Sequence, residues 1–382
     1  MKRRTSKKNQ YPNELLIAIP LIAIAVFCSL KYFSSPITKL SALSLEIVHP
    51  AAAMQSFMNS NENAVAVPSK KPAPPEKVPE TENKDDAILE TGANKSLTKT
   101  PSDILSMKKD AEIQMAQLAH SGVIVEKKYD VASSNASFKN VNIRNTTSSQ
   151  SVNIEELLNK KASLVIEDKT KPTVLIFHTH TTESFEMADL GWYSDNYVTR
   201  SDKPDRNVVR VGDAICEELK KAGINAIHDT TIYDGTYTGA YDRSRAGILK
   251  ILNENPSIKI VIDVHRDGIK QNDGTRIKPT TTVFNKKAAQ VMIIAGCQGG
   301  LVKQFPTWEE NLTFGLHLQE KVESLYSGTM RPILFCERKY NMDVTPCSLL
   351  LEFGSDSNTL EEVEYSGHLI GISLSKLIED YI

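Results

Sequence analysis

Apolar and polar residues follow two different spacings along the second half of the chain. Short apolar runs, typical of buried strands, are separated by longer segments whose apolar residues recur every three or four positions, as in amphipathic helices. The runs predict strands at residues 173–177, 224–227, 259–264, 290–295 and 348–353. The periodic segments predict helices at residues 206–222, 241–253, 308–326 and 361–378. This alternation indicates an α/β fold with a mostly parallel central sheet flanked by helices on both faces.

The N-terminus has the pattern of a membrane segment. Five lysine and arginine residues lie within residues 1–14, and an apolar run follows at residues 15–33. A membrane-spanning helix needs about 20 apolar residues, and a flanking basic cluster stays in the cytoplasm. We therefore expect a transmembrane helix that anchors the chain in the cell membrane, single-pass, with the rest of the chain extracytoplasmic. The alternative is a cleaved signal peptide, whose apolar region would be shorter, about 7–15 residues.

Residues 34–101 have the composition of a stalk and linker. Five prolines lie between residues 68 and 79 among lysines and glutamates, and such a segment buries too little apolar surface to fold. We expect a short helical stalk at residues 34–58 and a disordered, semi-extended tether at residues 59–101. Residues 102–165 predict a small N-terminal appendage or a lead-in to the main domain, which covers residues 166–382. The predicted elements of this lead-in are helices at residues 103–119 and 154–160 and a strand at residues 141–145.

Charge and cysteine content argue against two classes of protein. The formal net charge of -2 gives no electrostatic reason to expect nucleic acid binding. None of the five cysteines belongs to a C-x-x-C pair, so a cysteine zinc knuckle is not expected. We expect Cys216 and Cys297 to be buried thiols, whereas a disulfide between Cys336 and Cys347 is left open.

Two histidine-containing segments follow predicted strands, where ligands collect in an open α/β sheet. The first reads HTHTTE, and the alternation of side chains along a strand would point His178 and His180 to the same side. The second places His265 at a strand end, where Asp263 or Asp267 can hydrogen-bond an imidazole. A single histidine at such a place is usually structural. Three histidines at two strand ends, with a carboxylate nearby, instead predict a catalytic Zn²⁺ site.

Two glutamates complete the set of candidate site residues. Glu183 stands three residues after His180, a spacing that brings a carboxylate and an imidazole to one ion when a strand ends in a turn. Glu352 lies inside the apolar sequence LLEFG, where a carboxylate is costly unless it is paired, metal-bound or catalytic. Desolvation would raise its pKa and suit it to proton transfer. The alternative is a buried ion pair of Glu352 with Arg266 or Arg338.

The segments HTHTTESF, DVHRDG and LLEFGS occur in this order behind the basic N-terminus and the proline-rich linker. In these features the chain resembles the stage II sporulation protein P family, a relative of the zinc-dependent N-acetylmuramoyl-L-alanine amidases. The resemblance implies a peptidoglycan hydrolase that cleaves the amide between N-acetylmuramic acid and L-alanine, with endopeptidase activity on stem-peptide cross-links as well. It also implies septal wall thinning and engulfment during sporulation. The implied partners are a lytic transglycosylase (stage II sporulation protein D) and a membrane protein (stage II sporulation protein M).

The resemblance also implies roles for single residues. His180 and His265 match zinc ligands of the amidases, and Glu352 matches the glutamate that serves as catalytic base. The amidases take a third ligand, a glutamate, from the start of the next helix, but this chain has no glutamate at that predicted helix start. Glu183 is the expected substitute and His178 is the alternative ligand.

Two further expectations concern the substrate. Arg266 is expected to help polarise the amide carbonyl, and the Trp192–Tyr193 pair either lines a glycan-binding cleft or packs within a loop. Two other functions stay open. One is a non-catalytic peptidoglycan-binding scaffold, and the other is a zinc carboxypeptidase or endopeptidase. A pure binding protein would not need to hold this set of histidines and glutamates together.

Overall fold

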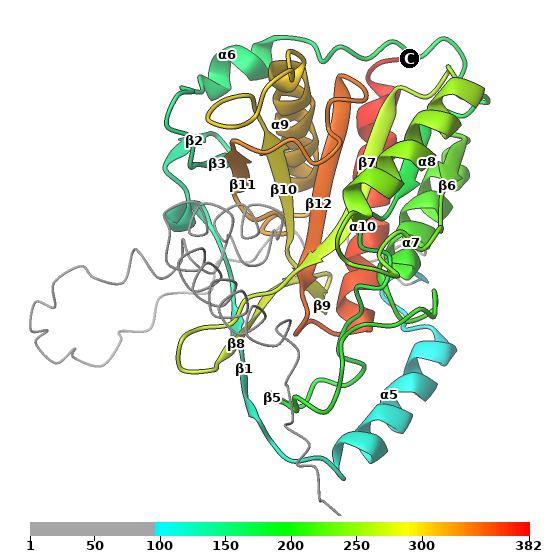
Figure 1. The fold of residues 1–382 in the computed structure, drawn as a ribbon, viewed down its shortest axis with the longest axis vertical. Coiled ribbons are helices and arrows are strands. Elements are labelled where there is room, and N and C mark those ends of the chain that lie inside the picture. Colours follow the sequence, from blue (N-terminus) through cyan, green and yellow to red (C-terminus); the bar gives the residue numbers. More distant parts are fainter. Residues whose placement is uncertain (1–95) are drawn as a thin grey trace, which may run out of the picture. The chain divides into compact units, whose positions relative to one another are not determined.

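A computed structural model of the chain describes residues 96–382, which belong to one compact unit (Figure 1). The expected basic N-terminus, the membrane anchor and most of the stalk and linker lie outside the described residues. Within residues 96–382, no helix combines the length and the apolar character needed to cross a membrane. The anchor therefore stays a prediction from the sequence.

An eight-stranded sheet forms the centre of the described domain. Its strands are β2 (Ala136–Phe138), β3 (Val141–Asn145), β4 (Val174–Phe177), β6 (Ala226–His228), β7 (Ile260–Asp267), β10 (Val291–Gly296), β11 (Ile333–Cys336) and β12 (Cys347–Ser355). They follow the order β2–β3–β11–β10–β12–β7–β4–β6 (Figure 1). Five of the seven neighbouring pairs are parallel, and only β2–β3 and β10–β12 are antiparallel. The mostly parallel central sheet expected from the sequence is confirmed.

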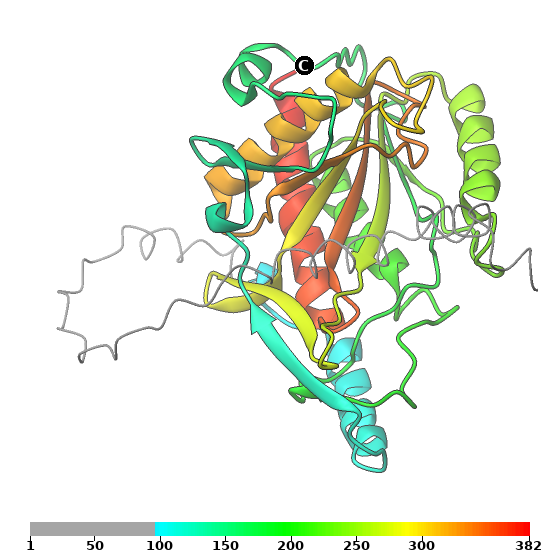
Figure 2. The ribbon, with the colours of Figure 1, turned by 60° about the vertical axis from the view of Figure 1, so that its left-hand side comes forward.

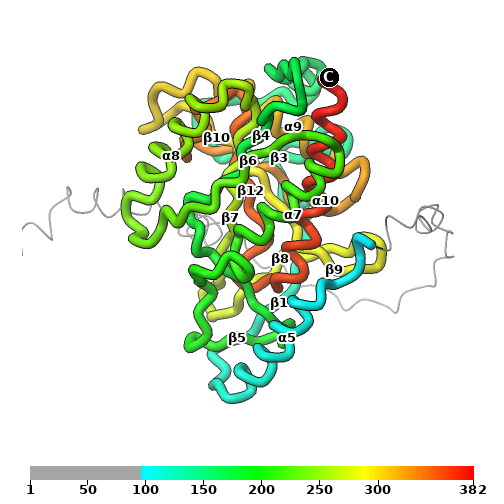
Figure 3. The backbone as a smooth tube through the Cα atoms, turned by 90° about the vertical axis from the view of Figure 1, so that its right-hand side faces the viewer, coloured from blue at the N-terminus to red at the C-terminus, as the bar shows by residue number. Residues whose placement is uncertain are grey.

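Helices cover the two faces of this sheet unequally. The covering helices are α7 (Val208–Lys221), α8 (Ala240–Glu254), α9 (Trp308–Leu325) and α10 (Leu360–Glu379). Figure 3 shows α8 on one side of β7 and β12, and α7 and α10 on the other. Because side chains alternate along a strand, Val174 and Ile260 pack in the core with α7, whereas Leu175 and Val261 pack with α8.

Residues 102–165, expected to be an appendage or a lead-in, are built into this domain. Strands β2 and β3 form one edge of the main sheet, where β3 pairs with β11. Helix α5 (Ser102–Met115) and helix α6 (Ile154–Asn159) contribute Ile104 and Leu157 to the main hydrophobic core. The segment therefore completes the domain that holds the site.

A second sheet of four strands was not expected from the sequence. Its strands are β1 (Gly122–Lys127), β5 (Trp192–Tyr193), β8 (Arg276–Val283) and β9 (Lys286–Ala289), and a short 3-10 helix (Val131–Ser133) follows β1. They follow the order β5–β1–β8–β9. Figure 2 shows β1 and α5 at the end of the described domain opposite the C-terminus. Strand β8 buries Lys278, whose ammonium lies 2.7 Å from Asp189 and 3.0 Å from Glu362.

Local signals set the ends of α7 and α10. The Asn207 side chain accepts a hydrogen bond from the Val209 N–H at 2.9 Å, and Gly223 follows α7 with a φ of 71°, the stop expected from the sequence. Thr359 and Glu362 form a reciprocal capping box at the start of α10. Both helix starts lie next to the loops that carry the candidate site.

Candidate metal centre

The HTHTTE, DVHRD and LLEFG segments meet at one edge of the main sheet. Strands β4, β7 and β12 lie side by side and run parallel, so their carboxyl ends lie together. In the register of these strands Glu352 lies beside His265, and Phe177 lies beside Asp263. The sequence therefore identified the strand ends correctly, and the topology makes them neighbours.

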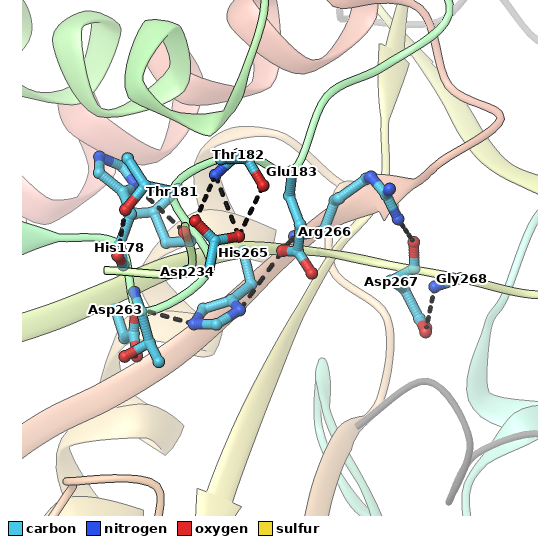
Figure 4. Close-up of polar contacts among 12 residues, drawn as sticks. His178, Thr181, Thr182, Glu183, Asp234, Asp263, His265, Arg266, Asp267 and Gly268 are labelled. Carbon is cyan, nitrogen blue, oxygen red and sulfur yellow. Dashed lines mark hydrogen bonds and ion pairs between the residues drawn. The ribbon is translucent and has the colours of Figure 1, made fainter. Parts of the chain in front are cut away.

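His265 is the centre of a row of polar contacts (Figure 4). Its side chain is buried, with Nδ1 3.4 Å from Oε2 of Glu183 and Nε2 2.8 Å from Oδ1 of Asp263. The Nε2 contact lacks hydrogen-bond geometry, so within the described domain this nitrogen has no hydrogen-bond partner. Burial opposes the charged imidazolium, but the two carboxylates raise the pKa of His265 well above its ordinary value.

His180 faces His265 across the end of β4. Their ring centroids lie 5.3 Å apart and the ring planes are nearly perpendicular, at 88°. The His180 side chain is buried, yet neither ring nitrogen has a hydrogen-bond partner among the described residues. Tyr237 stacks on the ring at a centroid distance of 4.6 Å. Burial lowers the pKa of His180 to about 4, so the neutral ring has a free lone pair at pH 7.

Glu183 lies between His265 and two arginines. The backbone N–H of Arg266 donates to its Oε2 at 3.1 Å, and the Arg200 guanidinium lies 3.7 Å from its Oε1. Burial alone would raise the pKa of Glu183, but the contact with His265 and the charges of His265 and His180 lower it well below its ordinary value. Glu183 is therefore anionic at neutral pH, the form in which a carboxylate binds a metal.

Glu352 is a buried carboxylate beside His265. In the part of the chain that the structure describes, its Oε2 atom has no hydrogen-bond partner. Burial raises the pKa of Glu352 well above its ordinary value, Asp267 acts in the same direction, and His265 opposes both. Asp267 is itself held by Arg331, with 2.9 Å between its Oδ2 and the guanidinium. A carboxyl with these properties can take up and release a proton near neutral pH.

The backbone immediately after Glu352 contains a bulge. The register between β12 and β7 shifts between Glu352 and Ser355. Gly354 has a φ of 60°, and a Cβ atom at this position would lie 2.4 Å from Oδ1 of Asn358. Glycine is therefore required here, both for the conformation and for space. The LLEFG sequence supplies the carboxylate and the glycine that lets the strand bend after it.

His178 points away from this site. Strand β4 ends at Phe177 and the chain turns there, so the alternation of a strand does not continue to His180. Nδ1 of His178 donates to the carbonyl of Val264 at 3.0 Å, and its Nε2 lies 2.8 Å from Nε2 of His228. The expectation that His178 and His180 share a side is wrong. Because both of its nitrogens are engaged, we leave His178 out of the ligand set.

Arg266 holds the loop after β4. Its Nε donates to the carbonyl of Ser184 at 2.6 Å, and its terminal nitrogens donate to the carbonyls of Asp267 at 3.1 Å and Thr199 at 2.8 Å. Figure 4 shows this side chain directed toward Asp267, away from His265. With its guanidinium committed to three carbonyls, Arg266 is not placed as the carbonyl-polarising group that was expected.

Several residues around the site had no signal in the sequence. Asp234 accepts hydrogen bonds from the Thr182 N–H at 3.1 Å and from Arg200 at 2.9 Å, and so ties two loops together. Tyr237 and Tyr241 come from the loop before α8 and from its first turn, and both rings lie against His180. No motif or apolar period marks these positions, because tertiary packing alone brings them to the site.

Two smaller expectations concern aromatic and cysteine residues. Trp192 stacks on His120 with ring centroids 3.6 Å apart, and Tyr193 is buried in the small sheet. Both residues form strand β5 and pack within the small sheet, and a role in binding glycan stays a prediction. The four cysteines of residues 96–382 are free thiols, so Cys336 and Cys347 are not bonded.

The model of the family described as stage II sporulation protein P matches residues 51–371 of this chain. The chain belongs to the stage II sporulation protein P family. The resemblance found in the sequence is thus confirmed, and all three of its segments lie within the matched residues. Stage II sporulation protein P of Bacillus subtilis (strain 168) is 30% identical over 222 residues, which cover 55% of this chain and 52% of that relative. The chain therefore spans about half the length of this curated relative.

Solved structures similar to this family member include two amidases and a peptidase. AmiC2, an N-acetylmuramoyl-L-alanine amidase of Nostoc punctiforme, is 10% identical with a TM-score of 0.32, over 55% of this chain and 96% of that chain. The CwlD amidase from Clostridioides difficile, in complex with the GerS lipoprotein, is 13% identical with a TM-score of 0.34, over 55% of this chain and 99% of that chain. A metallo-carboxypeptidase from Burkholderia cenocepacia is 12% identical with a TM-score of 0.30, over 56% of this chain and 58% of that chain. TM-scores this low do not establish a shared function.

The donor set of this family member suits a zinc ion by its chemistry. No group of three or more His, Cys, Asp or Glu side chains within residues 96–382 is already arranged around one metal position. The side chains present nevertheless include the buried His180 imidazole, whose two nitrogens have no partner among the described residues, and the buried His265 imidazole, whose Nδ1 lies 3.4 Å from the anionic carboxylate of Glu183. Imidazole nitrogen and carboxylate oxygen are zinc ligands, and buried polar atoms without partners are rare in folded proteins. A bound cation would satisfy all three side chains.

Proposed function

We propose that this protein is a zinc-dependent peptidoglycan amidase that cleaves the bond between N-acetylmuramic acid and L-alanine. The observation that carries the proposal is the set of buried, unpartnered polar atoms on His180, His265 and Glu352 at neighbouring strand ends. Membership of the stage II sporulation protein P family supports a role in sporulation and peptidoglycan as substrate. Endopeptidase activity on stem-peptide cross-links is part of the same proposal.

The roles of the residues follow from their positions. His180, His265 and Glu183 would hold the ion, and when bound, zinc supplies Lewis-acid chemistry that activates water and polarises the amide carbonyl. Glu352 Oε2 accepts a proton from the attacking water and returns it to the leaving amine nitrogen. Asp263 lies 2.8 Å from Nε2 of His265, so the ion would bind Nδ1, which faces Glu183. His265, whose pKa the two neighbouring carboxylates raise, would give up its proton when the ion binds, and Glu352 is the carboxyl that changes its protonation during the reaction.

The cellular part of the proposal rests on the sequence and the family. The basic N-terminus and apolar run support a membrane-anchored protein whose catalytic domain acts outside the cytoplasm. We propose that it thins septal peptidoglycan during engulfment, together with stage II sporulation proteins D and M. The proline-rich composition of the linker sequence suits a tether that would let the site reach the wall above the membrane.

The proposal is tested with the full chain, purified in detergent, on dye-labelled peptidoglycan. We expect stoichiometric zinc and dye release that stops with a chelator and returns with added zinc. The variant Glu352→Gln should keep its zinc and lose at least about 100-fold in turnover, the scale of general acid–base catalysis. Glu254→Gln, an exposed change at the far end of α8, is the matched control and should behave as wild type. Metal-free protein that binds the wall without cutting it would replace the amidase with a binding scaffold.

A further inference from the structure

Tyr241 lies at the candidate metal centre and has no role in the chemistry described so far. It belongs to the first turn of α8, and its ring packs edge-on against His180, with centroids 5.6 Å apart. The same ring is stacked parallel to His265, with centroids 6.5 Å apart. Its hydroxyl oxygen is buried and has no hydrogen-bond partner among residues 96–382. A half-buried phenol ring therefore lies against both candidate imidazole ligands, and its buried oxygen has no hydrogen-bond partner within the described domain.

Hydrogen bonds fix the position of Tyr241 relative to the strands. Its carbonyl accepts from the Asn341 side chain at 3.0 Å and from Ser244 Oγ at 3.2 Å. Ser244 Oγ in turn lies 2.9 Å from Thr179 Oγ1, which donates to Asp263 at 2.7 Å. This chain of contacts joins the first turn of α8 to the ends of β4 and β7. The backbone that carries the Tyr241 side chain is thus held in place before any substrate binds, and an effective transition-state donor needs such a fixed support.

The ring of Tyr241 is also fixed from its other side. Tyr340 stacks on it with centroids 5.3 Å apart. Tyr340 and Asn341 have φ angles of 42° and 59°, a conformation that costs free energy in residues other than glycine and is often found next to active sites. Arg245 of α8 binds Asp343 at 2.7 Å and so fastens this segment to α8, and Lys339 of the segment itself binds the same carboxylate at 2.8 Å.

The unpartnered hydroxyl is best explained by an absent acceptor. Leaving a buried hydroxyl unsatisfied costs about 1–3 kcal/mol, which a bound ligand would recover. A phenol has an ordinary pKa of about 10, so the Tyr241 hydroxyl is protonated at neutral pH and can donate. The acceptor is then a substrate oxygen that is uncharged or on which negative charge develops during the reaction. Arg266 cannot fill this role, because three backbone carbonyls occupy its guanidinium.

We propose that the Tyr241 hydroxyl donates a hydrogen bond to the carbonyl oxygen of the substrate amide, and that this bond strengthens as negative charge develops on that oxygen. The inference rests on the proposed amidase function and adds a catalytic residue to it. No bond to Tyr241 forms or breaks, and its proton stays on the phenol. The hydroxyl thereby takes the role that the sequence had suggested for Arg266.

The test is Tyr241→Phe, which removes the hydroxyl and keeps the stacking ring. Loss of one donor to a developing oxyanion lowers kcat by about 100- to 1,000-fold, and we expect this loss with KM and zinc content unchanged. Tyr233→Phe is the matched control. It also removes a buried hydroxyl near the start of α8, but that hydroxyl donates to Asp229 at 2.6 Å. The control should retain wild-type kcat.

A binding measurement separates this role from folding and from zinc loading. The ligands are an intact muramoyl peptide and a phosphinate analogue that carries a tetrahedral, charged centre in place of the amide. In the inactive Glu352→Gln background, Tyr241→Phe should weaken binding of the phosphinate by about 100-fold and change binding of the intact peptide by less than threefold. Equal kcat in wild type and Tyr241→Phe, or equal weakening of both ligands, overturns the role of Tyr241. A zinc-free, inactive wild type overturns the amidase proposal itself, so the two failures are distinguishable.

Discussion

Replacing Glu352 by glutamine should stabilise the metal-free protein while it abolishes activity. Oε2 of Glu352 is buried without a hydrogen-bond partner among the described residues, and burial raises the pKa of this carboxyl. A raised pKa means that folding favours the protonated form. Below a pH of about 4.3, the pKa of a glutamate in the unfolded chain, Glu352 is protonated in both states and its ionisation does not lower the free energy of unfolding. As the pH rises from there to the folded-state pKa, the free energy of unfolding falls, by about 1.4 kcal/mol for each unit of difference.

The size of the effect follows from the same contacts. An unsatisfied buried polar group costs about 1–3 kcal/mol, and the neutral glutamine amide recovers part of it. We therefore expect Glu352→Gln to raise the free energy of unfolding by about 1–2 kcal/mol at pH 8. In a domain of this size, each kcal/mol raises Tm by about 2–4 °C. Glu352→Gln should therefore raise Tm by about 2–8 °C at pH 8, and the gain should disappear near pH 4.

The assay is thermal unfolding of wild type and variant with a chelator present, from pH 4 to pH 8. Glu364→Gln is the matched control, because the Glu364 side chain is also buried but accepts a hydrogen bond from the Arg210 guanidinium at 2.6 Å. That variant should lose stability. A Glu352→Gln variant that is less stable than wild type at pH 8, or whose advantage does not change with pH, would refute the reasoning about a strained carboxylate.

Three other predictions follow from the site and its supports. His180→Ala should lose stoichiometric zinc, measured by elemental analysis, whereas His178→Gln should retain it, because the ring nitrogens of His178 bind Val264 and His228. Gly354→Ala should lower the free energy of unfolding by about 1–3 kcal/mol in chemical denaturation, since its φ is 60° and its Cβ would meet a side-chain oxygen. Removal of zinc should lower Tm, and its return should restore Tm. At a zinc concentration of 1,000 times Kd, bound zinc should raise the free energy of unfolding by about 4 kcal/mol. Unchanged Tm on chelation would contradict zinc binding to the folded state.

Much of the main domain could be predicted because its elements bury continuous apolar faces. Strand β7 and helix α10 are examples, since an apolar run and a helical period fix each of them locally. The small sheet escaped prediction because its strands are only partly apolar. Lys278 in β8 is buried by virtue of Asp189 and Glu362, which come from distant parts of the chain. A local sequence pattern cannot reveal ion pairs between residues that are so far apart in the chain.

The candidate site divides in the same way. His265 and Glu352 were found because each ends a recognisable apolar strand, and parallel pairing then makes them neighbours. The prediction for His178 failed because it extended strand alternation past Phe177, where the chain turns. Tyr241 was missed because its place at the site depends on a network of tertiary hydrogen bonds. Sequence patterns thus locate strand ends, whereas loops and turns decide which side chains meet there.

The most direct test of the central claim is to identify the bond that is cut. Purified peptidoglycan is incubated with the zinc-loaded full chain, and the soluble products are identified by mass spectrometry. The account predicts free stem peptides that begin with L-alanine, together with glycan strands that have lost their peptides, and neither product with chelator present. Release of terminal D-alanine alone would indicate a carboxypeptidase, and peptidoglycan left intact by zinc-loaded protein would contradict the account.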